Sequence, residues 1–230
     1  MRKAIIWDFD GVLVLTPHEK AWKLACQKLG IKGFTSSFYA DHVSGKPRME
    51  GALEILERLG GYHRDFILKT RKGRSLLEKL AYEKNSIYNR LISEGEYRPN
   101  EDALLFLLKA RSYGIVQVLA SASKNTVKLM DRISFKGEKL SGMFDYNFSG
   151  FYESKDDIIG YAVSHLEDMG IRRKCIILIE DSYTGIKAGN REGIKTICYR
   201  CRGSEEIDAY GRVDRLSNVD PQGLFDLLGC

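Results

Sequence analysis

The chain has 230 residues, of which 43% are hydrophobic and 29% are charged, with a formal net charge of +5 at pH 7. This length can hold one large α/β domain, or a core with a smaller insert, and the apolar content suits a globular protein with a packed core. Lysine and arginine are interleaved with aspartate and glutamate, which argues against a nucleic-acid-binding stripe, and no apolar run is long enough to span a membrane.

The first predicted strand ends in two aspartates. Residues 4–7 form a short apolar run that is typical of a buried strand, Asp8 and Asp10 follow it, and Gly11 marks the turn. Open α/β sheets bind their ligands at such strand ends. Two carboxylates one residue apart repel each other unless a cation lies nearby, so we expect a divalent metal and an acyl-phosphate intermediate here. The alternative is a strand end followed by an acidic turn without catalytic function.

A helical segment follows this strand. Residues 16–92 show three helical patterns with paired apolar residues and no strong strand run. We therefore predict an inserted helical domain over residues 16–92, and a core domain made of residues 1–15 and 93–230.

Beyond residue 92 strands and helices alternate. The predicted strands cover residues 115–120, 144–148, 175–179 and 196–199. The predicted helices cover residues 100–113, 124–133, 156–169 and 185–192. This alternation predicts an α/β fold in which a parallel sheet is joined by right-handed crossovers.

Polar residues follow three of these later strands. Ser121 ends one strand and could donate to a phosphate oxygen, although serine is also a common helix cap. Lys155 follows the next strand, where it could neutralise a phosphoryl group or simply be a solvated lysine. Glu180 and Asp181 end the most apolar strand, and such oxygen ligands suit Mg²⁺. Their order along the chain places all of them around one crevice.

The five cysteines are scattered along the chain. Their odd number and irregular spacing predict reduced thiols in the cytoplasm. Cys198 and Cys201 form a lone CxxC pair, and a zinc site would need a second pair of ligands. A redox role stays open, but the simpler interpretation is one thiol buried in a strand and one in a loop.

The complete set of motifs resembles the haloacid dehalogenase (HAD) superfamily, in its phosphatase and phosphomutase branch. The matching motifs are Asp-Phe-Asp-Gly-Val-Leu at residues 8–13, Ser121, Lys155, and Glu-Asp-Ser at residues 180–182. The resemblance implies a Rossmann-like parallel sheet core flanked by helices, with the helical insert as an α-helical cap domain.

Within this superfamily the chain looks most like the β-phosphoglucomutase-like subgroup. The similarity lies in Gly-Lys-Pro-Arg at residues 45–48, in Lys84-Asn85, and in Leu-Ala-Ser-Ala-Ser-Lys-Asn at residues 119–125.

The resemblance implies a role for each acidic residue. Asp8 would be the nucleophile that forms an aspartyl-phosphate, and its carboxylate would also bind Mg²⁺. Asp10 would be the general acid and base, with its main-chain carbonyl on the metal. Asp181 would complete the metal site, with Glu180 beside it or behind it.

The resemblance also implies how the phosphoryl group is held. Ser121, the main-chain N–H of Ala122 and Lys155 would bind its oxygens, and the cap would close over the site and select the substrate. Arg48 in the cap is a candidate for a further phosphate contact, because a guanidinium suits bidentate phosphate binding. The alternative for Arg48 is a solvated loop arginine.

Three positions depart from the family's pattern. Leu15 stands where the family often has aspartate, Tyr82 stands where we expect the cap lysine of the sugar phosphomutases, and His18 is shifted from the register of the cap histidine. These departures favour a phosphatase over a mutase, because a mutase must hold a second phosphate in its cap.

The sequence therefore predicts a Mg²⁺-dependent phosphatase that hydrolyses a small phosphorylated metabolite, such as a sugar phosphate, through an aspartyl-phosphate. The alternative is a hexose-phosphate mutase similar to β-phosphoglucomutase, and a catalytically idle binding module comes third. We expect a cytoplasmic monomer or weak dimer without nucleic-acid or membrane partners.

Overall fold

The computed structural model describes residues 1–123, 125–152, 154–202 and 208–230. The chain forms two compact units. The α/β unit contains Met1–Leu15, Arg98–Cys201 and the C-terminal stretch that ends at Cys230, and the main segment of the helical unit is Thr16–Tyr97. The helical unit extends past residue 92 because its last helix runs to Ser93.

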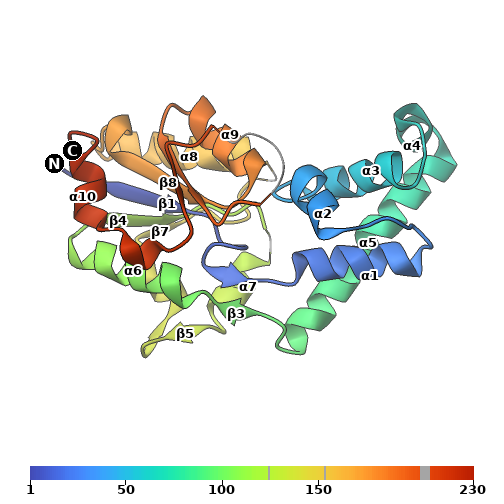
Figure 1. The fold of residues 1–230 in the computed structure, drawn as a ribbon, viewed down its shortest axis with the longest axis horizontal. Coiled ribbons are helices and arrows are strands. Elements are labelled where there is room, and N and C mark those ends of the chain that lie inside the picture. Colours follow the sequence, from blue (N-terminus) through green and yellow to red (C-terminus); the bar gives the residue numbers. More distant parts are fainter. Residues whose placement is uncertain (124, 153, 203–207) are drawn as a thin grey trace. The chain divides into compact units, whose positions relative to one another are not determined.

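The α/β unit is built on a six-stranded parallel sheet with the strand order β10-β9-β8-β1-β4-β7 (Figure 1). The strands are β1 (Ala4–Trp7), β4 (Val116–Leu119), β7 (Tyr146–Asn147), β8 (Ile176–Glu180), β9 (Lys195–Tyr199) and β10 (Gly211–Val213). The first strand lies in the middle, between β4 and β8, so its carboxyl end opens at the centre of the sheet edge.

Both faces of the central strand are buried, as its continuous apolar run predicts. Ile6 packs into the core formed with α8 (Lys155–Asp168) and α9 (Tyr183–Arg191) on one face. On the opposite face Trp7 makes an edge contact of 6.0 Å between ring centroids with Phe106 of α6 (Glu101–Ser112). The sheet is thus covered on both sides, which fixes the positions of its strand ends.

Short elements complete the α/β unit. They are β2 (Val14–Leu15) paired with β3 (Arg98–Pro99), β5 (Ser134–Phe135) paired with β6 (Glu138–Lys139), α7 (Thr126–Met130), α10 (Pro221–Asp226), and the 3₁₀ turns Leu140–Met143, Arg173–Cys175 and Leu216–Asn218. The antiparallel pair of β2 and β3 joins the two chain segments that lead out of this unit and back into it.

The described residues of the helical unit form five helices. They are α1 (His18–Lys28), α2 (Ser36–His42), α3 (Arg48–Arg58), α4 (Arg64–Lys69) and α5 (Arg71–Ser93). Thr70 caps the longest helix, α5, by accepting a hydrogen bond of 2.9 Å from the N–H of Gly73. Gly73 is required there, because a Cβ would lie 2.2 Å from the carbonyl oxygen of Phe66. The apolar faces of these helices enclose a core of their own around Trp22 and Leu56.

The predicted fold class is confirmed, and several boundaries are corrected. The strand predicted at residues 144–148 is reduced to Tyr146–Asn147, because β7 is an edge strand with one neighbour. The helix predicted at residues 124–133 is reduced to Thr126–Met130, and Lys124 lies outside the described residues.

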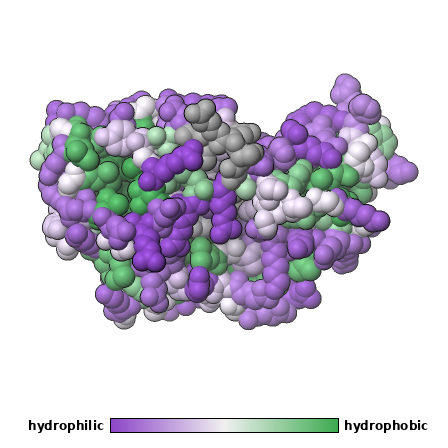
Figure 2. All heavy atoms as spheres, in the orientation of Figure 1, coloured by the Kyte–Doolittle hydropathy of each residue, from purple (hydrophilic) through white to green (hydrophobic). Residues whose placement is uncertain are grey.

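Within the described ranges, every helix is too short or too polar to cross a lipid bilayer. Polar residues cover most of the face that Figure 2 shows, with apolar residues in patches between them.

The prediction that the cysteines are reduced thiols is wrong for four of the five. Disulfides join Cys175 to Cys230 and Cys198 to Cys201, and Cys26 is free and buried. The first pairing was hidden in the sequence because it depends on the C-terminal residues folding back beside the start of β8, where the two Cα atoms lie 5.7 Å apart.

Candidate active site

Three of the predicted site residues meet at the carboxyl edge of the sheet. Asp8 follows β1 directly, Glu180 is the last residue of β8, and Lys155 is the first residue of α8. The ammonium of Lys155 contacts Oδ1 of Asp8 and Oε1 of Glu180. The side chains of Lys155, Asp8 and Glu180 are 8%, 6% and 0% exposed, so this is a buried ion triad.

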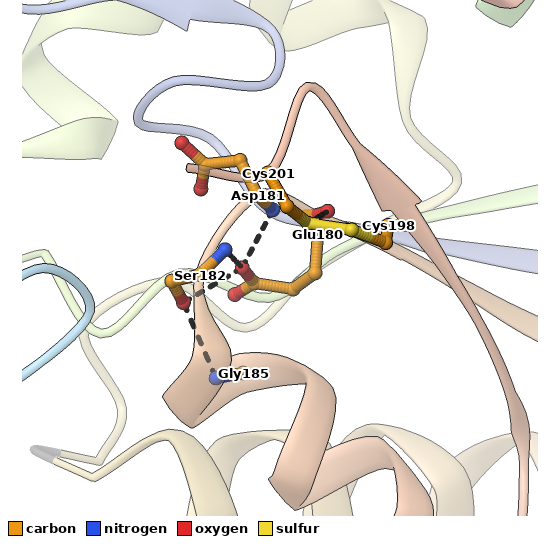
Figure 3. The surroundings of a disulfide bond; sticks show 6 residues. All are labelled: Glu180, Asp181, Ser182, Gly185, Cys198 and Cys201. Atoms are coloured by element: carbon orange, nitrogen blue, oxygen red, sulfur yellow. Dashed lines mark hydrogen bonds between the residues drawn. A yellow bond between two sulfur atoms is a disulfide. The ribbon is translucent and has the colours of Figure 1, made fainter. Parts of the chain in front are cut away.

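The other carboxylate oxygen of Glu180 holds the loop that follows β8. Its Oε2 accepts hydrogen bonds of 2.9 Å from the N–H of Asp181, the N–H of Ser182 and the hydroxyl of Ser182 (Figure 3). The Ser182 hydroxyl in turn accepts a bond of 3.2 Å from the N–H of Gly185 and so caps α9. Glu180 therefore orients the loop, which leaves Asp181 to face the site.

Two glycines make room for these carboxylates. A Cβ on Gly185 would lie 2.0 Å from Oε1 of Glu180, and a Cβ on Gly11 would lie 2.0 Å from Oδ2 of Asp181. Gly11 also has a φ of +87°, which favours glycine, and its N–H donates to the carbonyl oxygen of Val14 at 2.8 Å. The turn after Asp10 can thus approach Asp181 closely only because position 11 lacks a side chain.

The cluster contains more carboxylates than the single ammonium of Lys155 can neutralise. Burial raises the pKa of Asp8 to about 7, and Glu180 and Asp10 add to this rise while Lys155 opposes it. Burial also raises the pKa of Asp181 well above its ordinary value, with Glu180 and Asp8 adding to the effect. For Lys155 burial disfavours the charged form, but Asp8 and Glu180 outweigh it and raise its pKa above the usual value.

A divalent cation fits this arrangement. Among the described residues, carboxylate oxygens of Asp8, Glu180 and Asp181 lie within 4.8 Å of one another. Carboxylate oxygens are the ligands that Mg²⁺ prefers, and a positive ion would stabilise the charged forms of Asp8 and Asp181, which burial and the neighbouring carboxylates disfavour. Since both oxygens of Glu180 already accept hydrogen bonds from protein donors, Asp8 and Asp181 are the better placed ligands.

Asp10, Ser121 and Ala122 complete the predicted set in the α/β unit. Asp10 is half-buried and forms a backbone bridge with Val14. Ser121 is 2% exposed and lies two residues after β4 ends at Leu119, and Ala122 after it is half-buried.

Two neighbours that sequence reasoning missed hold the Ser121 hydroxyl. Its Oγ lies 3.2 Å from the N–H of Ser123 and 3.2 Å from the hydroxyl of Thr126, both of which can donate to it. With its oxygen satisfied in this way, the Ser121 hydroxyl can use its own hydrogen to donate to an anion. The signal that could have found Thr126 is a hydroxyl residue one helical turn after a strand-end serine.

Arg48 belongs to the helical unit. It is the first residue of α3, and it is exposed.

The helical unit contains a buried lysine, Lys84, that the comparison with the family's cap-lysine position did not identify. Tyr82, which stands at the position expected for a mutase lysine, is 71% exposed. Lys84 is 5% exposed, and its ammonium lies 2.7 Å from Nδ1 of His18. The His18 ring stacks on Tyr88 at 4.3 Å, and Lys84 lies 4.9 Å from the centroid of the Tyr88 ring. The spacing of Lys84 and Tyr88, one helical turn apart on α5, was the available signal.

The parallel sheet, the aspartate after its central strand and the acidic loop beside it define an enzyme that acts on phosphate esters. The sequence matches the family model for haloacid dehalogenase-like hydrolases over residues 2–193. The chain belongs to this family.

Solved structures of this family share the complete fold. A β-phosphoglucomutase from the hyperthermophilic archaeon Pyrococcus sp. strain ST 04 is 40% identical, with a TM-score of 0.81 and 98% of each chain covered. A β-phosphoglucomutase from Clostridium difficile is 24% identical, with a TM-score of 0.74, 100% of this chain covered and 98% of the other. CbbY from Rhodobacter sphaeroides, solved with phosphate, is 22% identical, with a TM-score of 0.69 and coverage of 94% and 96%. A comparison with curated protein sequences finds no match.

Proposed function

We propose that this protein is a Mg²⁺-dependent phosphomutase that interconverts phosphate positions on a hexose, with β-glucose 1-phosphate as the first substrate to test. The observation that carries the phosphoryl-transfer chemistry is the buried triad in which Lys155 holds Asp8 at the end of the central strand. A carboxylate fixed at that edge, in contact with an ammonium, can attack an anionic phosphoryl group.

In the proposed reaction Oδ of Asp8 attacks phosphorus and forms an aspartyl-phosphate. Asp10, two residues further along the chain, protonates the leaving oxygen and then takes a proton from the hydroxyl that accepts the phosphoryl group. The Ser121 hydroxyl and the Lys155 ammonium hold the phosphoryl oxygens, and the N–H of Ala122 is a further donor.

Mg²⁺, which Asp8 and Asp181 would hold, would supply the positive charge that lets an anionic nucleophile meet an anionic substrate. The protein's own contribution to this step is to fix Asp181, through the three hydrogen bonds that Glu180 Oε2 accepts from the loop. We propose that Glu180 acts on the metal through this loop.

The helical unit is proposed to be the cap domain, and its buried cation favours the mutase over the phosphatase. A mutase must bind a second phosphate outside the catalytic aspartate, which requires positive charge in its cap. The sequence argument against a mutase used Tyr82, but buried Lys84 pairs with half-buried His18 in this unit. The 40% identity to an archaeal β-phosphoglucomutase over 98% of the chain supports the same proposal. Arg48 is proposed to add a further cation at the substrate.

The second candidate is a phosphatase that releases inorganic phosphate from a small phosphorylated metabolite. The matching family model describes hydrolases, and Asp10 could activate water in place of a sugar hydroxyl. The two candidates share every step up to the aspartyl-phosphate and differ in what removes it.

One experiment separates them. The protein is incubated with Mg²⁺, β-glucose 1-phosphate and a catalytic amount of glucose 1,6-bisphosphate, and glucose 6-phosphate and free phosphate are followed together. We expect glucose 6-phosphate to form much faster than free phosphate. Free phosphate as the main product would select the phosphatase, and no turnover of this or other phosphorylated metabolites would refute both. Lys84→Met should slow mutase flux more than phosphate release, and exposed Lys79→Met is the matched control on the same helix.

A further inference from the structure

A disulfide lies directly beside the acidic loop of the candidate site. Cys198 is in β9 and is the partner of Glu180 in the register between β8 and β9. Its disulfide partner Cys201 lies in the turn after β9, and Sγ of Cys201 is 3.8 Å from the main-chain carbonyl oxygen of Glu180. Figure 3 shows the disulfide next to the strand end from which Glu180, Asp181 and Ser182 follow.

The same disulfide packs against the helix that begins at this loop. Cys198 forms a small apolar cluster with Ile186, and Tyr183 and Cys201 pack against it. Tyr183 and Ile186 belong to the first turn of α9, whose cap is Ser182. The Cys198–Cys201 bridge therefore supports both sides of the acidic loop, the end of β8 and the start of α9.

Chain stabilisation is smaller for this bridge than for the other one. The stabilisation from a disulfide grows with the length of the loop that it closes, and Cys198 and Cys201 are only 3 positions apart. The other disulfide, Cys175–Cys230, spans 55 positions and restrains the unfolded chain more.

Exposure differs between the two cysteines of the bridge. Cys198 is 2% exposed, whereas Cys201 is half-buried, as is Cys230 of the other disulfide. Thiol–disulfide exchange requires in-line attack on an accessible sulfur, so a thiolate would attack Sγ of Cys201, the more exposed of the two cysteines.

We propose that Cys198 and Cys201 form a redox-modifiable site that a dithiol reductant opens, and that its state regulates the acidic loop at Glu180 and Asp181. The regulatory part rests on the proposed function, whereas the modification itself does not.

The reductant supplies both electrons of the exchange. One of its thiolates attacks Sγ of Cys201, the S–S bond breaks, and its electron pair leaves on the sulfur of Cys198, which takes up a proton. The second thiolate of the reductant then attacks its own mixed-disulfide sulfur, and Cys201 leaves and is protonated. Two electrons and two protons pass to the protein, and the reductant becomes a cyclic disulfide.

Opening the bridge has a direct structural consequence. Cys201 is no longer tied to β9, so the carbonyl side of Glu180 and the first turn of α9 lose a fixed support. The position of Asp181 depends on this loop, because its N–H donates to Glu180 Oε2 at 2.9 Å. Reduction should therefore weaken Mg²⁺ binding and lower activity, in the way that changes behind a metal ligand do.

The test uses the full chain after air oxidation. Samples are equilibrated in graded mixtures of reduced and oxidised dithiothreitol, alkylated, and analysed by peptide mass spectrometry. We expect Cys198 and Cys201 to become labelled at a reduced-to-oxidised ratio about tenfold lower than Cys175 and Cys230. In the same mixtures, calorimetric titration should show Mg²⁺ affinity falling by about tenfold as Cys198 and Cys201 open.

Two variants keep the result interpretable. Cys201→Ser should bind Mg²⁺ like the reduced wild type and should not respond to dithiothreitol, while Cys230→Ser should keep the response. The proposal is overturned if Cys198 and Cys201 open only together with the other pair, or if they open without a change in Mg²⁺ affinity. Absence of turnover in both redox states would count against the proposed function, and the labelling and the calorimetry would still decide the redox proposal.

Discussion

The ammonium of Lys155 contacts the carboxylate of Asp8, although 147 positions separate the two residues in the sequence. The contact exists because β1 lies between β4 and β8, so that the segment before α8 and the end of β1 open at one edge of the sheet. The same ammonium reaches Glu180, and one cation thus serves two buried carboxylates. The nucleophile proposed for this enzyme is held by a residue from a distant segment of the chain.

Replacing Asp8 with Asn should abolish turnover and leave the fold intact. The amide keeps the shape of the carboxylate but cannot form the acyl phosphate, so the rate should fall by about a thousandfold or more. The measurement is steady-state phosphoryl transfer together with thermal unfolding. Activity within tenfold of the wild type would rule out covalent catalysis at Asp8, and Asp65→Asn at an exposed site of the helical unit is the control.

Replacing Lys155 with Met should destabilise the metal-free protein strongly. It leaves Asp8 and Glu180 buried without their shared partner, and breaking a buried ion pair in this way costs roughly 3–5 kcal/mol. Denaturant unfolding in EDTA measures the loss, and added Mg²⁺ should restore part of it. Exposed Lys69→Met, which removes an ion pair with Asp65, should change stability by less than about 0.5 kcal/mol.

Two glycines in helices allow a matched test of packing at the site. Gly185→Ala places a Cβ 2.0 Å from Oε1 of Glu180, a buried atom that cannot move without leaving Lys155, so both stability and Mg²⁺ affinity should fall. Gly160→Ala in α8 meets only the end of Glu192, at 3.0 Å. That variant should be neutral or stabilising by up to about 1 kcal/mol, since alanine is the better helix former. Equal behaviour of the two variants in chemical denaturation would contradict the tight packing around Glu180.

The sequence could predict the parts of the site that lie at strand ends. Asp8 and Glu180 follow or end an apolar run, Lys155 comes after the strand predicted at residues 144–148, and parallel strands bring their carboxyl ends to one edge. The contacts that depend on helix packing could not be predicted. The pairing of Lys84 with His18 requires α1 and α5 to pack side by side, and no local pattern specifies which residues then face each other.

The disulfide pairings could not be predicted from the sequence for a different reason. Spacing alone does not show which cysteines approach each other, and Cys175 meets Cys230 only because α10 returns the C-terminus to the start of β8. The short strand β7 was overestimated at its ends: the N–H groups of Asp145 and Phe148 still donate to β4, but only Tyr146 and Asn147 pair with it in register.

Removing the long-range disulfide should lower stability without changing the chemistry. Cys230→Ser frees the loop of 55 positions that the Cys175–Cys230 bridge closes, and a loop of this size contributes about 4 kcal/mol in the chain-entropy account. Denaturant unfolding of the oxidised proteins measures the difference, and turnover at 25 °C should stay near that of the wild type. Unfolding midpoints that coincide for wild type and variant would show that the bridge does not restrain the unfolded chain.

The stability of the metal-free protein should fall as the pH rises from 5 to 8. Burial, with Glu180 and Asp10 adding to it, raises the pKa of Asp8 to about 7 from its ordinary value of 3.8. Between these two values the folded state therefore holds a proton that the unfolded state releases. The contribution of Asp8 to the stability of the protein is greatest below about pH 4, and it is lost as the pH rises through 7. The pKa of Asp181 is raised as well, and it changes the stability in the same direction.

Thermal unfolding in EDTA measures this effect, and the Tm should decrease from pH 5 to 8. The Asp8→Asn variant should show a flatter decrease. Added Mg²⁺ should raise the Tm most at the alkaline end, where both carboxylates are charged. A Tm in EDTA that rises steadily from pH 5 to 8 would show that the pKa values of these carboxylates are not raised in the folded protein.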